Sequence, residues 1–136
     1  MKILIVCSKH FYDRIPPVQS TLQKLGHAVM MPNSYDEPFA EERMKTISPS
    51  AHQEWKAKMM RRHHDSINAN DAVLVLNFEK KGQPNYIGGA TFMEIAKAFE
   101  LEKKIFLYNP IPETIFKDEL LGMGVSVIDG ELTRLS

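Results

Sequence analysis

Asn85–Phe99 has the sequence NYIGGATFMEIAKAF and follows an apolar segment, Asp71–Asn77, from which a polar loop separates it. A strand, a loop, a glycine pair and a helix in this order direct backbone N–H groups toward an anion, because the first helical turn has unpaired donors and about half a positive charge. Gly88 and Gly89 let a ligand approach the backbone closely. Glu94 lies early in the predicted helix, above the carboxyl edge of the strand. We therefore predict Glu94 as the catalytic residue and both glycines as substrate-binding residues.

A second interpretation of Glu94 stays open, because the segment Thr91-Phe92-Met93-Glu94 also fits a capping box. In that arrangement Thr91 caps the helix and Glu94 folds back onto it. The glycine pair instead favours a helix that begins before Thr91, so that Thr91 and Glu94 share one face and Thr91 becomes a candidate substrate-binding residue. Tyr86, just before the glycines, is a further candidate that either stacks on a ligand ring or covers the core.

Composition limits the class of protein. The 136 residues suffice for one domain, residues 1–136, with a sizeable core. Acidic and basic residues number 17 each, which argues against a nucleic-acid or membrane partner gathered by net charge. A single cysteine excludes an internal disulfide framework and suits a reducing cytoplasm, where we expect the protein. The apolar start, Ile3–Cys7, is too short for a signal peptide core or a membrane span.

Apolar runs alternate with helical periodicity along the whole chain. The predicted strands are Ile3–Cys7, His27–Met31, Asp71–Leu76, Lys104–Tyr108 and Val125–Ile128. The predicted helices, besides the one in the opening stretch, are Val18–Leu25, Phe39–Ile47, about Ser50–Ile67 and Glu113–Leu121, and Ser8–Pro17 is predicted as a loop. The long helix should turn one face inward, formed by Trp55, Met59, Met60, His63 and Ile67.

This alternation predicts an α/β protein with a mostly parallel five-stranded sheet, a single-domain three-layer sandwich of the flavodoxin-like or Rossmann-like kind. Ligands of such sheets bind beyond the carboxyl ends of the strands. Three loops should converge there, Cys7–Lys9, Asn77–Gly89 and Asn109–Pro110. The candidate substrate-binding residues therefore also include Cys7, Ser8, Asn77 and Asn109. Cys7 is alternatively a structural thiol, and the two asparagines alternatively satisfy their own turns.

Four segments resemble the nucleoside 2-deoxyribosyltransferase-like superfamily, and in particular a subgroup of small proteins within it. They are the start Lys2–Ser8, the second strand Gly26–Val29, the third strand Asn70–Asn77, and the glycine–threonine–glutamate segment Gly89–Glu94. In the superfamily, a small residue, a threonine-like residue and then a glutamate three residues after the threonine open the helix that bears the catalytic glutamate. Only Glu94 matches that position.

The resemblance implies cleavage or exchange of an N-glycosidic bond in a nucleoside or nucleotide. Glutamate attacks the anomeric carbon, and a second base or water resolves the covalent intermediate. Transferases of the superfamily also have an acidic residue a few positions before that glutamate, whereas Asn85–Gly89 contains none. This departure keeps a non-catalytic nucleotide or nucleotide-sugar sensor as the alternative. Asp71 begins its strand, at the wrong end of the sheet for chemistry.

Other site classes receive less support. Six residues separate Cys7 from Arg14, one more than a cysteine phosphatase loop has. Walker A, Gly-x-Gly-x-x-Gly and zinc-ligand patterns are absent, so we predict no cofactor and no metal site. The basic cluster of the long helix is either a solvated face or a phosphate clamp; its members are Lys56, Lys58, Arg61, Arg62, His63 and His64. We expect a homo-oligomer, with Trp55 and the neighbouring methionines as a possible contact surface.

Overall fold

The computed structural model describes residues 1–136 and contains a five-stranded, all-parallel sheet in the order β2-β1-β3-β4-β5. The strands are β1 (Lys2–Val6), β2 (Ala28–Met30), β3 (Ala72–Val75), β4 (Lys104–Leu107) and β5 (Ser126–Val127). The α-helices are α1 (Ile15–Lys24), α2 (Ala40–Ile47), α3 (Pro49–Asn68), α4 (Gly89–Glu100) and α5 (Lys117–Gly122), and two 3₁₀ helices are η1 (Lys9–Arg14) and η2 (Leu132–Arg134). This is the flavodoxin-like strand order, and the predicted α/β domain with a five-stranded parallel sheet is confirmed.

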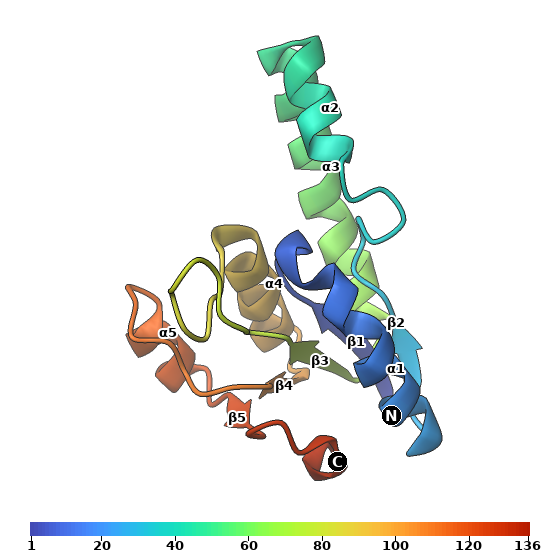
Figure 1. Ribbon diagram of the computed structural model, residues 1–136, viewed down its shortest axis with the longest axis vertical. Helices are drawn as coiled ribbons and strands as arrows, with labels where there is room; N and C mark the ends of the chain where they lie inside the picture. The colour runs from blue at the N-terminus through green and yellow to red at the C-terminus, as the bar shows by residue number, and fades with distance from the viewer.

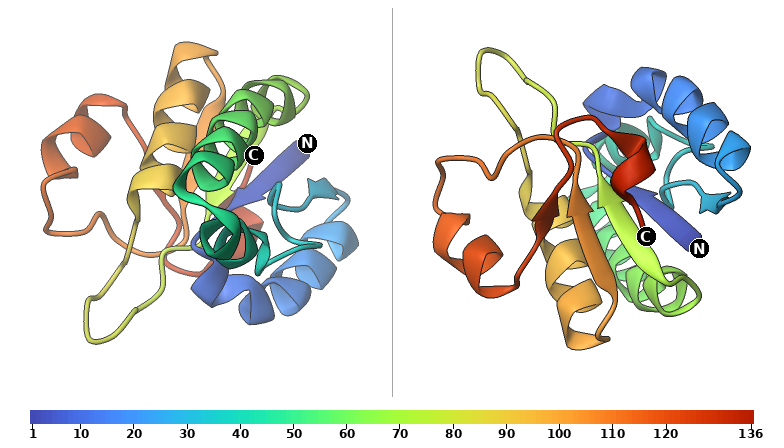
Figure 2. Two further views of the ribbon diagram at one scale, coloured as in Figure 1. Left: turned by 90° about the horizontal axis from the view of Figure 1, so that it is seen from above. Right: turned by 90° about the horizontal axis from the view of Figure 1, so that it is seen from below.

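Helices cover both faces of the sheet (Figure 2). Successive strand residues point to opposite faces. Ile3 and Ile5 of β1 accordingly belong to one core cluster, with η1, α1 and the chain end, whereas Leu4 and Val6 belong to another, with α3, α4 and α5. The central strands are therefore buried on both sides, which is why they read as continuous apolar runs.

Helices α2 and α3 form an antiparallel hairpin that rises above the carboxyl edge of the sheet (Figure 1). Ser48 separates them and caps α3, because its side chain accepts a hydrogen bond from the Ala51 N–H at 3.0 Å. Only the lower end of α3 reaches the core, through Ile67. Neither α3 nor any other helix combines the length and apolar composition that crossing a bilayer requires.

Two segments differ from the sequence-based prediction. Ser8–Pro17 was expected to be a loop, but Lys9–Arg14 is a 3₁₀ helix and α1 begins at Ile15. The two prolines occupy the first turn of α1, where a missing N–H costs nothing. Helix α5 begins at Lys117, four residues later than predicted.

The strand register brings the functional loops together. Val6 of β1 lies beside Val75 of β3, and Val75 lies beside Leu107 of β4, so the three strands end at one edge. The loops that follow β1, β3 and β4 therefore leave from neighbouring points, as predicted.

Two adjacent leucines of α5 provide a test of this packing. Leu120 is fully buried, whereas its neighbour Leu121 is 56% exposed. Leu120→Ala should lower the free energy of unfolding by about 2–5 kcal/mol, because it leaves a cavity in the core, and Leu121→Ala should change it by less than about 0.5 kcal/mol. Urea denaturation of both variants measures this difference. Equal effects of the two substitutions would contradict the placement of α5.

Candidate active site

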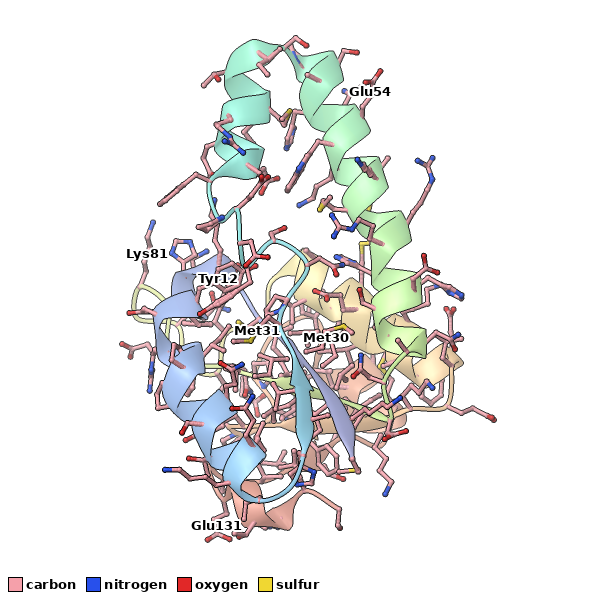
Figure 3. All side chains as sticks on the ribbon, turned by 90° about the vertical axis from the view of Figure 1, so that its right-hand side faces the viewer. Tyr12, Met30, Met31, Glu54, Lys81 and Glu131 are labelled. Atoms are coloured by element: carbon pink, nitrogen blue, oxygen red, sulfur yellow. The ribbon has the colours of Figure 1, made fainter.

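A cavity of about 330 Å³ lies at the carboxyl edge of the sheet, beneath the α2–α3 hairpin. This volume lies in the range of pockets that hold small molecules. Four segments line it: the β1–η1 region with Cys7 to Tyr12, the loop before α2, the α3 face with Trp55 to His63, and the β3–α4 connection with Lys80 to Glu94. Figure 3 shows Tyr12 on the side of the fold from which the hairpin rises.

The start of α4 forms one wall of the cavity. The helix is capped by Gly88, and its first internal hydrogen bond runs from the Phe92 N–H to the Gly88 carbonyl at 2.9 Å. The N–H groups of Gly89, Ala90 and Thr91 have no partner in the chain, and all three residues border the cavity. These donors and the positive end of the helix dipole favour an anionic or hydroxyl-bearing ligand.

Thr91 is the third residue of α4, so it does not cap the helix and the capping-box interpretation of Glu94 is wrong. Thr91 and Glu94 both face the cavity, three residues apart, as the alternative interpretation requires. Glu94 is largely buried, with 8% of its surface exposed. Its carboxylate has no hydrogen bond or ion pair within the chain and is not fully covered, so its oxygens border the cavity.

Burial governs the ionisation of this region. It raises the pKa of Glu94 to about 8, because no cation or hydrogen-bond donor of the chain compensates the negative charge. Burial, together with the nearby Glu94, raises the pKa of the Cys7 thiol to about 12. The pKa of Tyr12 is raised by burial and then by Cys7 and Glu94. Three protonated acids therefore share the cavity of the free protein near neutral pH.

The glycine pair has two distinct surroundings. A Cβ at Gly88 would lie only 3.0 Å from Tyr86 Oη, so the tyrosine ring packs against this glycine. A Cβ at Gly89 would meet nothing within 4 Å. Tyr86 both borders the cavity and packs on the core through Phe11, at 6.5 Å between ring centres, so both of its predicted roles are compatible with its position.

Asn77 and Asn109 do not border the cavity, unlike the other predicted substrate-binding residues, which are Cys7, Ser8, Tyr86, Gly88, Gly89 and Thr91. The buried Asn77 side chain donates to the carbonyls of Asn109 and Pro110 at 3.0 and 3.1 Å and accepts from the Asn109 N–H at 2.8 Å. The Asn109 amide donates in turn to the Asn77 carbonyl at 3.1 Å. The two asparagines thus tie the β3 and β4 loops together and satisfy their own turns.

The α3 face that was expected to enter the core borders the cavity instead. Of its predicted members only Ile67 is buried in the core, whereas the others line the cavity; these are Trp55, Met59, Met60 and His63. The expected homo-oligomer, with Trp55 and the neighbouring methionines as its contact surface, stays a prediction. Sequence reasoning also missed Tyr12, Asn33 and Ser34 as cavity residues, because they lie in segments without a motif.

Cations at the cavity differ in whether they are paired. Lys56 pairs with Glu41 at 3.2 Å, and Glu41 also contacts His52 at 2.9 Å. Lys9 pairs with Glu42 of α2. Lys80 has no carboxylate partner, and its Nζ lies 4.5 Å from the centre of the Tyr86 ring. The remaining residues of the predicted basic cluster, Lys58, Arg61, Arg62 and His64, are exposed to solvent. No group of three or more His, Cys, Asp or Glu side chains is arranged to hold a metal ion.

The fold can be compared with known proteins. No protein-family model and no curated protein sequence matches this chain. The solved structure of the Clostridium botulinum CMP N-glycosidase BcmB matches with a TM-score of 0.54 and 17% identity over 94% of this chain and 86% of that chain. The 2-deoxyribosyltransferase of Bacillus psychrosaccharolyticus matches with a TM-score of 0.53 and 19% identity over 85% of this chain and 77% of that chain. The chain therefore shares the overall fold of these two proteins.

The raised pKa of Glu94 has a consequence for stability. Because the pKa of about 8 exceeds the ordinary value of 4.5, the folded protein retains a proton that the unfolded chain releases between these values. Raising the pH through this window should therefore destabilise the wild-type protein relative to Glu94→Gln, by at most about 1.4 kcal/mol per pH unit. Urea denaturation of both proteins between about pH 5 and pH 8 measures the difference. Parallel pH profiles would show that Glu94 ionises normally.

Proposed function

We propose that the protein cleaves, or exchanges the base at, the N-glycosidic bond of a nucleoside or nucleotide, with Glu94 as the nucleophile. The observation that carries this proposal is the unpartnered Glu94 carboxylate at the cavity, beside the free N–H groups of α4. Two proteins with this fold, a CMP N-glycosidase and a 2-deoxyribosyltransferase, carry names for reactions of this class.

The reaction requires the ionised form of Glu94, so the carboxyl group that the free protein holds largely protonated near neutral pH first releases its proton to solvent. Ionised Glu94 attacks the anomeric carbon, a C–O bond forms, and the C–N bond breaks as its electron pair leaves with the base, which then takes up a proton. The carboxylate also faces the positive charge that develops on the sugar in the oxocarbenium-like transition state. Water or a second base then attacks the same carbon and releases Glu94. Poor hydration in the cavity keeps the ionised carboxylate reactive.

The remaining cavity residues bind the substrate. The free N–H groups of Gly89 and Thr91 donate to sugar hydroxyls or to a phosphate, and the unpaired Lys80 adds a positive charge at the same side. Ser8, whose hydroxyl otherwise contacts only the His10 N–H at 3.4 Å, adds a further polar group. Cys7 and Tyr86 complete the floor and wall near Glu94.

The alternative function is nucleotide or nucleotide-sugar binding without turnover. It is favoured by one observation, the absence of an acidic residue from Asn85–Gly89 just before Glu94. A departing base needs a proton, and without an acidic residue at this position the protein would bind a nucleotide without releasing its base. Both functions use the same cavity, so turnover distinguishes them.

Base release tests the proposed function. The protein is incubated with a panel of nucleosides and 5′-nucleotides, and free base is measured by chromatography. We expect release by the wild type that falls to background in Glu94→Gln, because the amide cannot act as the nucleophile. Glu100→Gln is the matched control, since Glu100 lies on the same helix but is exposed and pairs with Lys97.

Thermal stabilisation by the same compounds is measured in parallel. Ligand-induced stabilisation without base release would favour the binding alternative. If no compound of the panel releases base and none stabilises the protein, both functions are contradicted.

A further inference from the structure

Two consecutive lysines, Lys80 and Lys81, lie on a tight turn beside the cavity. The Lys80 N–H donates to the Gln83 carbonyl at 3.0 Å, and the Gln83 N–H donates to the Lys80 carbonyl at 2.9 Å. Lys81 and Gly82 between them have φ angles of 49° and 82°, as a type I′ turn requires. The position of Lys81 favours Asn, Asp or Gly, and a residue held in such an unfavourable backbone conformation points to a functional segment. We call Lys80–Gln83 the lysine turn.

The chain does not neutralise the lysine turn. Neither of its lysines forms an ion pair, although Glu79 directly precedes them. Three carboxyl groups border the cavity, and none of them compensates these lysines. Glu37 and Glu41 pair with other cations, and burial raises the pKa of Glu94 to about 8, so that it is largely protonated near neutral pH. Two positive charges therefore remain uncompensated at this side of the cavity.

The start of η1 lies next to the lysine turn. Lys9 and His10 border the cavity, as Lys80 does. Slight burial and then the charges of three lysines lower the pKa of His10; these are Lys80, Lys81 and Lys9. Figure 3 accordingly shows Lys81 beside the start of η1. Lys9 is paired with Glu42, but His10 remains as a neutral ring with an N–H donor near pH 7.

The two lysines lie at different depths. Lys80 Nζ lies 4.5 Å from the centre of the Tyr86 ring, which packs against Gly88, the cap of α4. Lys80 borders the cavity and Lys81 does not. Lys80 and the N-terminus of α4 together supply about +1.5 charges, which roughly balances the −1.5 to −2 of one phosphate monoester. Lys81 is then left over for a second anionic group, farther out.

We propose that the lysine turn and His10 bind the outer phosphate of a nucleoside 5′-diphosphate or of a diphosphate-linked nucleotide sugar, while the nucleoside lies in the cavity. Lys80 contacts the inner phosphate and Lys81 the outer one, with His10 as an additional donor to the outer phosphate. This inference rests on the proposed function in taking a nucleotide as the ligand, and it narrows the substrate class to compounds with a diphosphate.

Calorimetric titration tests the preference for a diphosphate. Glu94→Gln, which lacks the proposed nucleophile, is titrated without divalent cations. The ligands are the 5′-mono- and 5′-diphosphates of the common nucleosides and their diphosphate-linked nucleotide sugars. We expect about tenfold tighter binding of a diphosphate than of the monophosphate with the same base, and the nucleotide sugars show whether the outer phosphate is bound free or esterified. If neither diphosphate class binds more tightly than the monophosphates for any base, the proposal is overturned.

Substitutions in the same background test the assignment of each lysine. Asparagine suits the backbone conformation at position 81, so Lys81→Asn removes the charge and keeps the turn. It should weaken diphosphate binding about tenfold and leave monophosphate binding unchanged, whereas Lys80→Gln should weaken both. Lys24→Gln is the matched control and should weaken neither, because Lys24 is exposed, forms no ion pair and lies at the end of α1 away from the cavity. An equal effect of Lys81→Asn on both ligand classes, or on neither, in protein whose folding is checked by thermal unfolding, would overturn the proposal.

The diphosphate site and the catalytic proposal fail separately. If the lysine variants behave as expected but the wild type releases base from none of these compounds, the diphosphate site stands and the catalytic proposal is rejected. If the wild type releases base and no diphosphate binds more tightly than its monophosphate, the diphosphate site is rejected and the catalytic proposal stands. If no nucleotide binds at all, both are rejected.

Discussion

A carboxyl group without a partner lies at the carboxyl edge of the sheet, and the ionisation of the cavity around it depends on this group. Glu94 is covered by the chain but receives neither a hydrogen bond nor an ion pair from it. An ionised carboxylate in such surroundings is unfavourable, so the free protein holds Glu94 protonated and its pKa rises to about 8. Under the proposed function, the positive charge that develops on the sugar compensates the ionised carboxylate, so that Glu94 stabilises the transition state.

The fold explains how one short helix start creates this situation. The parallel register ends β1, β3 and β4 at one edge, and α4 begins there with free N–H groups while turning Glu94 toward the cavity. The α2–α3 hairpin then covers the site. Its α3 face brings Trp55, Met59 and Met60 to the cavity opposite Glu94. The result is a cavity that is bordered by Glu94 and the start of α4, by Lys80, which has no carboxylate partner, and by one face of α3.

Features set by local chemistry were predictable from the sequence. Apolar runs bounded by polar loops predicted all five strands, and the glycine pair correctly favoured a helix that begins before Thr91. The α3 face could not be assigned, because four-residue spacing is the same whether a helix faces a core or a cavity. Asn77 and Asn109 were predicted to contact a ligand. Their hydrogen bonds to each other could not be foreseen, because these bonds depend on the register of two strands that lie far apart in sequence. At 17% and 19% identity, the similar structures show a shared fold and do not assign a role to these individual side chains.

The most direct measurement of the central claim is to trap the glycosyl-enzyme. A nucleoside or nucleotide with fluorine at the sugar 2-position destabilises the oxocarbenium-like transition state and slows both steps, so that the covalent intermediate can be digested and located by mass spectrometry. The account predicts one sugar adduct, on the peptide that contains Glu94, and none in Glu94→Gln. Base release by the wild type with an adduct on another residue, or with no adduct at all under single-turnover conditions, would contradict the assignment of Glu94 as the nucleophile.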